Sequence, residues 1–99
     1  MQQMMKQAKI MQKKMAETQE ELKKMEFEAS AGGGAVKVRV NGDQEVLDVK
    51  LDTEMIDAQD LDMVEDMVMV AVNDALKQSK DEAKSKMAGL TGGMNIPGF

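Results

Sequence analysis

An apolar heptad repeat runs through the first 25 residues and constrains the fold more than any other feature of the chain. Apart from Thr18, its a and d positions hold Met1, Met4, Ala8, Met11, Met15, Leu22 and Met25. A repeat of this period keeps the apolar positions on one side of a supercoiled helix, and a helix of about 24 residues is about 36 Å long. A chain of 99 residues builds only a thin core. Part of this apolar seam must therefore pack against another helix, from this chain or from a partner.

Three short segments after this helix alternate apolar and polar residues, which is the period of a β-strand with one buried face. They cover residues 25–31, 35–40 and 45–51, separated by three glycines at 32–34 and by Asn41-Gly42. Asn-Gly is a strong signal for a two-residue type I′ turn, although a four-residue loop would keep the same faces aligned. We expect a three-stranded antiparallel meander, apolar on one side. Expected inside are Val36, Val38, Val40, Leu47, Val49 and Leu51, and expected outside are Lys37 and Arg39.

The second half of the chain predicts another long helix. Asp52 and Thr53 end the last strand and cap a single helical turn at residues 54–56, and Asp60 is the expected N-cap of the long helix. A broad apolar stripe follows, formed by Leu61, Val64, Val68, Ala71, Val72, Ala75 and Leu76 and widened by Met63, Met67 and Val70. A stripe this wide has two surfaces to cover, the sheet and something else. We expect the helix to end near residues 87–89.

The predicted fold class is α+β, in the order α-β-β-β-α with a long helix at each end. We expect one domain over residues 1–88 and a flexible tail over residues 89–99, where glycine and proline recur.

The composition argues against catalysis. The chain has no cysteine and no histidine, so it lacks the usual thiol nucleophile, the neutral-pH proton carrier and the commonest metal ligand. The glycine triplet precedes a strand and lacks the lysine of a phosphate-binding loop, and the carboxylates at 57–66 lack the spacing of a calcium loop. We expect no enzyme, cofactor or metal site. No signal peptide or membrane span is visible, so we expect a cytoplasmic protein.

The net charge of −5 conceals a strongly uneven distribution. Residues 1–24 hold six lysines against three glutamates, a net of +3, and residues 77–99 hold four lysines against two carboxylates, a net of +2. Residues 25–76 hold three basic residues against thirteen carboxylates, a net of −10. Phosphate binding depends on the local field, so both basic ends are candidate contacts. The alternative is that these lysines are ordinary solvated helix faces.

Several segments together resemble the YbaB/EbfC family of nucleoid-associated proteins. They are the glycine triplet with Val36-Lys37-Val38, the Asn41-Gly42 turn, Val49-Lys50-Leu51-Asp52, Ala71-Val72-Asn73-Asp74-Ala75, Lys86-Met87 and Leu90-Thr91-Gly92-Gly93. The resemblance implies a tweezer-like homodimer that binds double-stranded DNA at the nucleoid through the helices at the two chain ends. On this sequence it points to Lys6, Lys9, Lys13, Lys77, Lys80 and Lys84, with Lys14, Lys86, Gln3 and Gln7 as weaker candidates.

Two functions follow from these observations. The first is duplex DNA binding by a homodimer with weak or broad sequence specificity, because lysines bind phosphate as point charges and neither lysine stripe carries arginine or an aromatic residue. The second is a protein-protein interaction module that uses the Met-rich seam and the acidic middle of the chain. Dimer or packing contacts are expected at Met4, Ala8, Met11, Met15, Val64, Val68 and Ala71.

Overall fold

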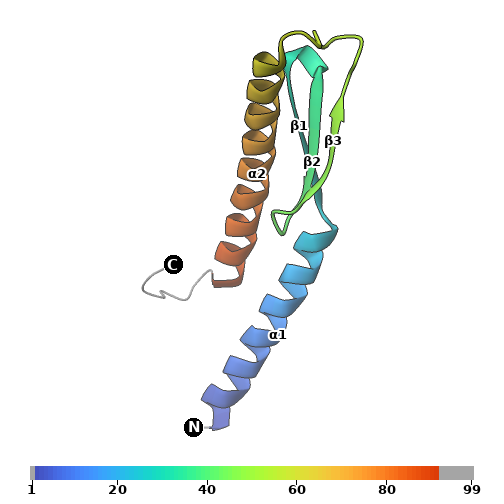
Figure 1. The fold of residues 1–99 in the computed structure, drawn as a ribbon. Coiled ribbons are helices and arrows are strands. Elements are labelled where there is room, and N and C mark those ends of the chain that lie inside the picture. Colours follow the sequence, from blue (N-terminus) through green and yellow to red (C-terminus); the bar gives the residue numbers. More distant parts are fainter. Residues whose placement is uncertain (1, 92–99) are drawn as a thin grey trace.

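Residues 2–91, which are the residues that the structure describes, fold into two long helices and a three-stranded sheet (Figure 1). The structure is a computed structural model. Its elements are α1 (Gln2–Lys24), β1 (Glu26–Ala31), the 3₁₀ turn η1 (Gly32–Gly34), β2 (Val36–Asn41), β3 (Val46–Leu51) and α2 (Leu61–Thr91). The predicted α+β class and the order α-β-β-β-α are confirmed. Helix α2 runs slightly past the end expected from the sequence, and residues 92–99 of the expected tail lie outside the described residues.

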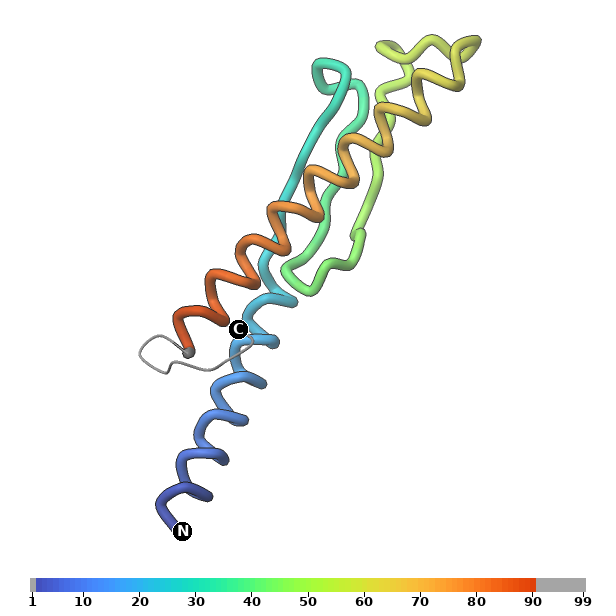
Figure 2. The backbone as a smooth tube through the Cα atoms, turned by 90° about the vertical axis from the view of Figure 1, so that its left-hand side faces the viewer, coloured from blue at the N-terminus to red at the C-terminus, as the bar shows by residue number. Residues whose placement is uncertain are grey.

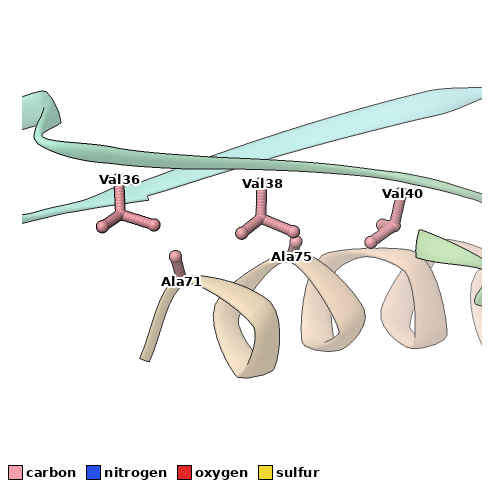
Figure 3. Close-up of a cluster of buried hydrophobic side chains, with 5 residues drawn as sticks. All are labelled: Val36, Val38, Val40, Ala71 and Ala75. Atoms are coloured by element: carbon pink, nitrogen blue, oxygen red, sulfur yellow. The ribbon is translucent and has the colours of Figure 1, made fainter. Parts of the chain in front are cut away.

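The hydrophobic core lies between one face of the sheet and α2 (Figure 3). Val36, Val38 and Val40 alternate along β2 with outward-facing polar residues, as the period of two predicted, and none of the three is exposed. They point toward Ala71 and Ala75, which are also fully buried. Burying one valine side chain stabilises a fold by about 1.5 kcal/mol or more. This row of valines therefore holds α2 against the sheet.

Strand β3 lies outside the cover of α2. The sheet is antiparallel in the order β1-β2-β3, and the pairs Val36↔Leu51 and Val38↔Val49 place all four side chains on the face that carries α2. A helix is about 10 Å wide and strands are about 4.8 Å apart, so one helix covers two strands. Helix α2 covers β1 and β2, and Val49 and Leu51 are 43% and 46% exposed. The prediction that Leu47, Val49 and Leu51 are buried is therefore wrong for the single chain.

The turn between β2 and β3 is wider than the predicted type I′ turn. Neither Asn41 nor Gly42 has positive φ, and Gln44 adopts the left-handed conformation instead, at φ 65°. The Gln44 amide donates to the Asn41 carbonyl at 3.2 Å, which closes the turn. The side-chain oxygen of Asn41 accepts hydrogen bonds from the amides of Asp43 and Glu45 at 3.0 and 2.9 Å. Asn41 thus stabilises the four-residue loop, the longer of the two lengths that the strand faces allow.

The turn between β1 and β2 and the connection between β3 and α2 follow the prediction more closely. All three glycines of η1 have positive φ, so they form a turn between strands. Before α2, the amide of Glu54 donates to the side chain of Asp52 at 3.0 Å, and Ile56 donates to its carbonyl at 3.1 Å, which gives the expected single turn. The amide of Met63 donates to the Asp60 side chain at 3.2 Å, so Asp60 is the N-cap of α2.

The molecule is elongated, with extents of 67 × 23 × 16 Å (Figure 2). Its radius of gyration is 18.8 Å, whereas a globular domain of about 100 residues has a radius of gyration of about 13 Å. The excess comes from α1, which continues beyond the end of the sheet (Figures 1 and 2). A chain of this shape leaves much of its apolar surface uncovered.

Candidate nucleic-acid interface

The N-terminal part of α1 projects away from the rest of the chain. Near its C-terminal end, Thr18 and Leu22 are only 8% and 5% exposed. Toward its N-terminal end, Met4 is 74% exposed and Ile10 is 53% exposed. Only the last turns of α1 are therefore anchored, and the free turns present every side of the helix to solvent.

A hydrogen-bonded junction fixes the direction in which α1 projects. The amide of Gly42, in the β2–β3 turn, donates to the carbonyls of Leu22 at 2.8 Å and Met25 at 3.1 Å. A Cβ atom at position 42 would collide with the Leu22 carbonyl oxygen, so the glycine is needed for this close approach. The buried hydroxyl of Ser79 on α2 donates to the Asn41 carbonyl at 2.7 Å. The turn thus ties α1 to α2.

Lys6, Lys9 and Lys13, the α1 lysine trio, lie on the projecting part of α1. All three side chains are exposed. Their i, i+3, i+7 spacing places them in one stripe, on the side of the helix opposite the buried Thr18 and Leu22. Within residues 2–91 no ion pair involves any of the three. Their charges are therefore available to an anionic partner.

Lys77, Lys80 and Lys84, the α2 lysine trio, form a second stripe with the same spacing. These side chains are also exposed and have no ion pair in the described part of the chain. They lie on the side of α2 opposite the fully buried Ala75 and Ser79, which face the sheet and the turn.

The two trios face away from one another within one chain. Helix α2 covers one side of the sheet and also contacts the end of α1, which lies on the sheet's side of α2 (Figure 1). The α1 trio points away from α2, because the buried side of α1 faces α2. The α2 trio points away from the sheet and from α1. The sequence predicted the two stripes but not their relative direction, which depends on how the helices pack.

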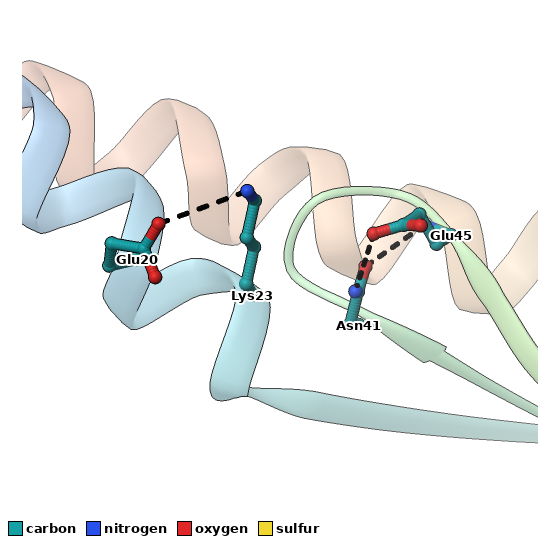
Figure 4. A network of polar contacts seen from close by, with 4 residues as sticks. All are labelled: Glu20, Lys23, Asn41 and Glu45. Atoms are coloured by element: carbon teal, nitrogen blue, oxygen red, sulfur yellow. Dashed lines mark hydrogen bonds and ion pairs between the residues drawn. The ribbon is translucent and has the colours of Figure 1, made fainter.

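The other candidate residues and basic side chains of the helices differ in burial and in whether they form ion pairs. Lys86 is half-buried and forms an ion pair with Glu21 of α1 at 3.5 Å, so this weaker candidate instead links the helices. Lys23 lies 3.9 Å from Glu20, beside the turn that holds Asn41 (Figure 4). The remaining weaker candidates are exposed on α1: Gln3, Gln7 and Lys14.

The expected packing residues occupy two different environments. On α2, Ala71 is fully buried against the sheet, and Val64 and Val68 are half-buried. On α1, Met4 and Ala8 are exposed, and Met11 and Met15 are half-buried. The α2 group packs within the chain, and most of the α1 seam is uncovered.

A larger uncovered apolar surface was missed by sequence reasoning. It combines the face of β3 with the flank of α2 nearest to it, and we call it the β3–α2 surface. Its exposed members are Val46, Leu47, Val49, Leu51, Leu61 and Met69. The width of the α2 stripe signalled a second contact, but the alternating pattern of β3 suggested that the strand was already buried.

The described residues contain neither a candidate metal site nor a candidate membrane span. No group of three or more acidic, histidine or cysteine side chains is arranged to hold a metal ion there. Neither α1 nor α2 combines the length and hydrophobicity that crossing a membrane requires.

Comparison with known proteins gives a consistent result. Residues 1–94 match the YbaB/EbfC DNA-binding family. A nucleoid-associated protein of Syntrophobacter fumaroxidans is 51% identical over 95 residues, which cover 96% of this chain and 86% of that protein. A nucleoid-associated protein of Moorella thermoacetica is 46% identical over 99 residues, covering 100% and 95%. The crystal structure of an uncharacterized protein from Helicobacter pylori has the same fold, with a TM-score of 0.84 at 24% identity over 91% of this chain and 95% of that one.

Proposed function

Because the chain belongs to the YbaB/EbfC DNA-binding family, we propose that it binds double-stranded DNA at the nucleoid as a homodimer. The basic faces of α1 and α2 supply the contacts, the sequence specificity is weak or broad, and the protein catalyses no reaction. The lysine stripe on the projecting part of α1 is the observation that carries this proposal.

The charge of α1 favours a polyanionic partner. Residues 2–14 contain four lysines and no carboxylate, and the α1 lysine trio is exposed and free of ion pairs in the described chain. Duplex DNA carries one negative charge for about every 1.7 Å of its axis. A straight row of cations on a free helix can follow such a partner without rearranging the core.

The residue types favour contact with the backbone over reading of bases. Both trios consist of lysines, which bind phosphate as point charges. Bidentate recognition of guanine is commonest with arginine, and stacking on bases needs aromatic rings. The single arginine, Arg39, lies on the sheet and is engaged by Glu26 and Asp48. Shape and charge therefore dominate the proposed recognition.

The β3–α2 surface supports the homodimer. Exposed apolar side chains that gather on one side of a molecule, rather than being scattered singly, mark a contact site. A second copy is the occupant that we propose, because the surface continues from the intrachain core and a two-fold interface pairs one patch with itself. The elongated shape agrees, since a chain of this size without disulfides gains stability from association.

Two copies also resolve the opposite orientation of the trios. One straight duplex cannot contact both sides of the α1–α2 pair in one chain. A dimer can place the trio of one copy beside a trio of the other, so that both line the same gap. The tweezer-like arrangement implied by the family resemblance has this property.

A salt titration of duplex binding by the purified protein tests the electrostatic mechanism. We expect affinity to fall steeply between about 50 and about 200 mM salt, by about 0.9 log units per log unit of salt for each phosphate neutralised. A flat salt response would contradict contact through lysines and phosphates.

A substitution in the β3–α2 surface tests the dimer separately. Val49→Asp places a charge in the centre of the exposed strand face, and we expect sedimentation to show single subunits where the unchanged chain is dimeric. The control is Met55→Asp, at an exposed position outside this surface, which should remain dimeric. A stable, well-folded monomer of the unchanged chain would contradict the proposal.

A protein-protein interaction module is the second candidate function. The observation that favours it is the end of the molecule opposite to the tip of α1, where Met55, Leu61 and Met63 are exposed among carboxylates. A gel shift with duplex DNA and a pull-down, compared at the same salt concentration, separate the two functions.

A further inference from the structure

We propose that the outer face of the sheet, which is the face away from α2, is a second phosphate-contacting surface for the duplex that lies along α1. This inference rests on the proposed DNA-binding function and extends the interface beyond the helices. Lys37 and Lys50 are the residues that make the contact.

The outer face carries an unneutralised pair of lysines. Lys37 on β2 and Lys50 on β3 are register partners in the antiparallel sheet, and both side chains are exposed. Cross-strand partners have Cβ atoms about 5 Å apart, so like charges at these positions destabilise the sheet. No ion pair of the described chain involves either lysine. An anion bound between them would remove this repulsion.

The neighbouring row of the same face contains a cation that carboxylates of the same chain neutralise. Arg39 lies between Glu26 on β1 and Asp48 on β3, with its guanidinium nitrogens 3.2 and 2.9 Å from their carboxylates. The lysine row has no such carboxylates: the residue paired with Lys37 on β1 is Ser30. A hollow of about 190 Å³ on this face is lined by three cations, Lys37, Lys50 and Arg39, together with Glu28, Asp48 and Val38, and it is large enough for phosphate oxygens.

The outer face of the sheet and the α1 lysine trio face the same way. Helix α2 covers one side of the sheet and of the anchored end of α1 (Figures 1 and 2). The trio lies opposite the buried side of α1, and Lys37 and Lys50 lie opposite the covered side of the sheet. The two groups are therefore on one long side of the molecule, opposite to the α2 trio and to α2 itself.

The spacing between the two groups fits a duplex. From Lys13 to the level of Ser30, beside Lys37, the chain passes through about 12 residues of helix and about five of strand, or about 35 Å. One turn of B-DNA is about 34 Å long, so the same strand returns to the same side after this distance. A duplex parallel to the long axis can thus contact the trio and the lysine pair one turn apart.

The test compares the unchanged chain with Lys37→Gln/Lys50→Gln on duplexes of two lengths. On a duplex of about 30 base pairs we expect the Kd to rise about tenfold and the salt dependence to weaken by about two phosphate contacts per chain. On a duplex of about 7 base pairs, which at about 3.4 Å per base pair is too short to reach both groups, we expect equal affinities. The control, Ala58→Glu/Gln59→Glu, makes the same change in net charge at exposed positions outside this face, and it should lose no more than about threefold in affinity through added repulsion at that end.

A stability measurement separates a binding role from a folding role. Lys37→Glu places a carboxylate opposite Lys50, so we expect Tm to rise by about 2 °C while affinity for the long duplex falls. A lower Tm with unchanged affinity would assign the lysines to folding and overturn the inference.

Failure of the inference differs from failure of the proposed function. Equal affinity of Lys37→Gln/Lys50→Gln and the unchanged chain for the long duplex would overturn the sheet contact and leave the helix contacts standing. Absence of duplex binding by the unchanged chain at every length would overturn both.

Discussion

The two ends of this 67 Å molecule carry opposite charge. Residues 2–14 at one end contain four lysines and no carboxylate, on a helix with no intrachain cover over its first turns. Residues 52–66, in the loop before α2 and its first turns at the other end, contain seven carboxylates and no basic residue. The basic end holds its charges on a free helix, whereas part of the acidic end uses its carboxylates to cap backbone amides.

This contrast shows why the net charge of −5 is a poor guide to the partner. A polyanion interacts with the charges that it can approach. The Debye length at physiological salt is about 8 Å, which is much shorter than the distance between the two ends, so the charge at one end is screened from a partner at the other. The carboxylates of the acidic end therefore do not prevent a polyanion from contacting the basic end.

Reversing the charge of the α1 lysine trio has the largest expected effect on affinity for duplex DNA. We expect Lys6→Glu/Lys9→Glu/Lys13→Glu to weaken duplex binding at least 100-fold, or by about 2.7 kcal/mol, because phosphate attraction becomes repulsion in both copies. The trio lies away from the β3–α2 surface, so sedimentation should still show a dimer. Fluorescence anisotropy with a labelled duplex measures the affinity.

The control for this variant is Gln12→Glu/Gln19→Glu, which adds carboxylates to α1 outside the trio. It should lose only a few-fold in affinity. If the trio variant binds as well as this control, the assignment of the contact to α1 is wrong.

Gly42→Ala disturbs the junction that joins the basic end to the core and tests how much this junction contributes to stability. The added methyl group meets the Leu22 carbonyl oxygen, and overpacking of this kind costs about 2 kcal/mol of unfolding free energy. Urea unfolding measures the loss. Gly89→Ala is the control, because open space surrounds that position on α2 and alanine favours a helix over glycine by about 1 kcal/mol. A Gly42→Ala variant as stable as the unchanged chain would show that the junction does not hold α1.

Sequence reasoning was most successful where a local pattern determines the outcome. The heptad repeat predicted α1, the alternation of Val36, Val38 and Val40 predicted the buried face of β2, and Asp60 was identified as the cap of α2. Each of these depends on a few neighbouring residues and a fixed period.

The failures concern quantities that depend on distant parts of the chain. Alternation places Val49 and Leu51 on the inner face, but only the width of one helix decides that β3 stays uncovered. Spacing predicts each lysine stripe, but the relative direction of the two stripes is set by the contact of Gly42 with Leu22. The glycine there serves a close backbone approach, and the residue with positive φ is Gln44, so the Asn-Gly signal was correct about a turn and wrong about its type.

Asp60→Ala separates the carboxylates that stabilise the fold from those that only add charge to the acidic end. The Asp60 side chain accepts the Met63 amide at 3.2 Å, and loss of such an N-cap costs about 1 kcal/mol. Asp66→Asn, which removes a carboxylate further along α2, should cost less than about 0.5 kcal/mol. Thermal unfolding of the two variants checks the difference, and equal losses would mean that the cap contributes nothing beyond its charge.

Neutralising the acidic end has the smallest expected effect and tests how far the duplex extends along the molecule. We expect Glu54→Gln/Asp62→Asn/Glu65→Gln to bind a long duplex about two- to threefold more tightly at about 50 mM salt, where the Debye length is about 14 Å. The gain should vanish at about 300 mM salt, because screening then removes repulsion between the phosphates and this end. If the duplex contacted α1 alone, these carboxylates would lie several Debye lengths away and no gain would appear at either salt concentration. A gain confined to low salt therefore favours a duplex that reaches the Lys37 and Lys50 pair, next to the acidic end.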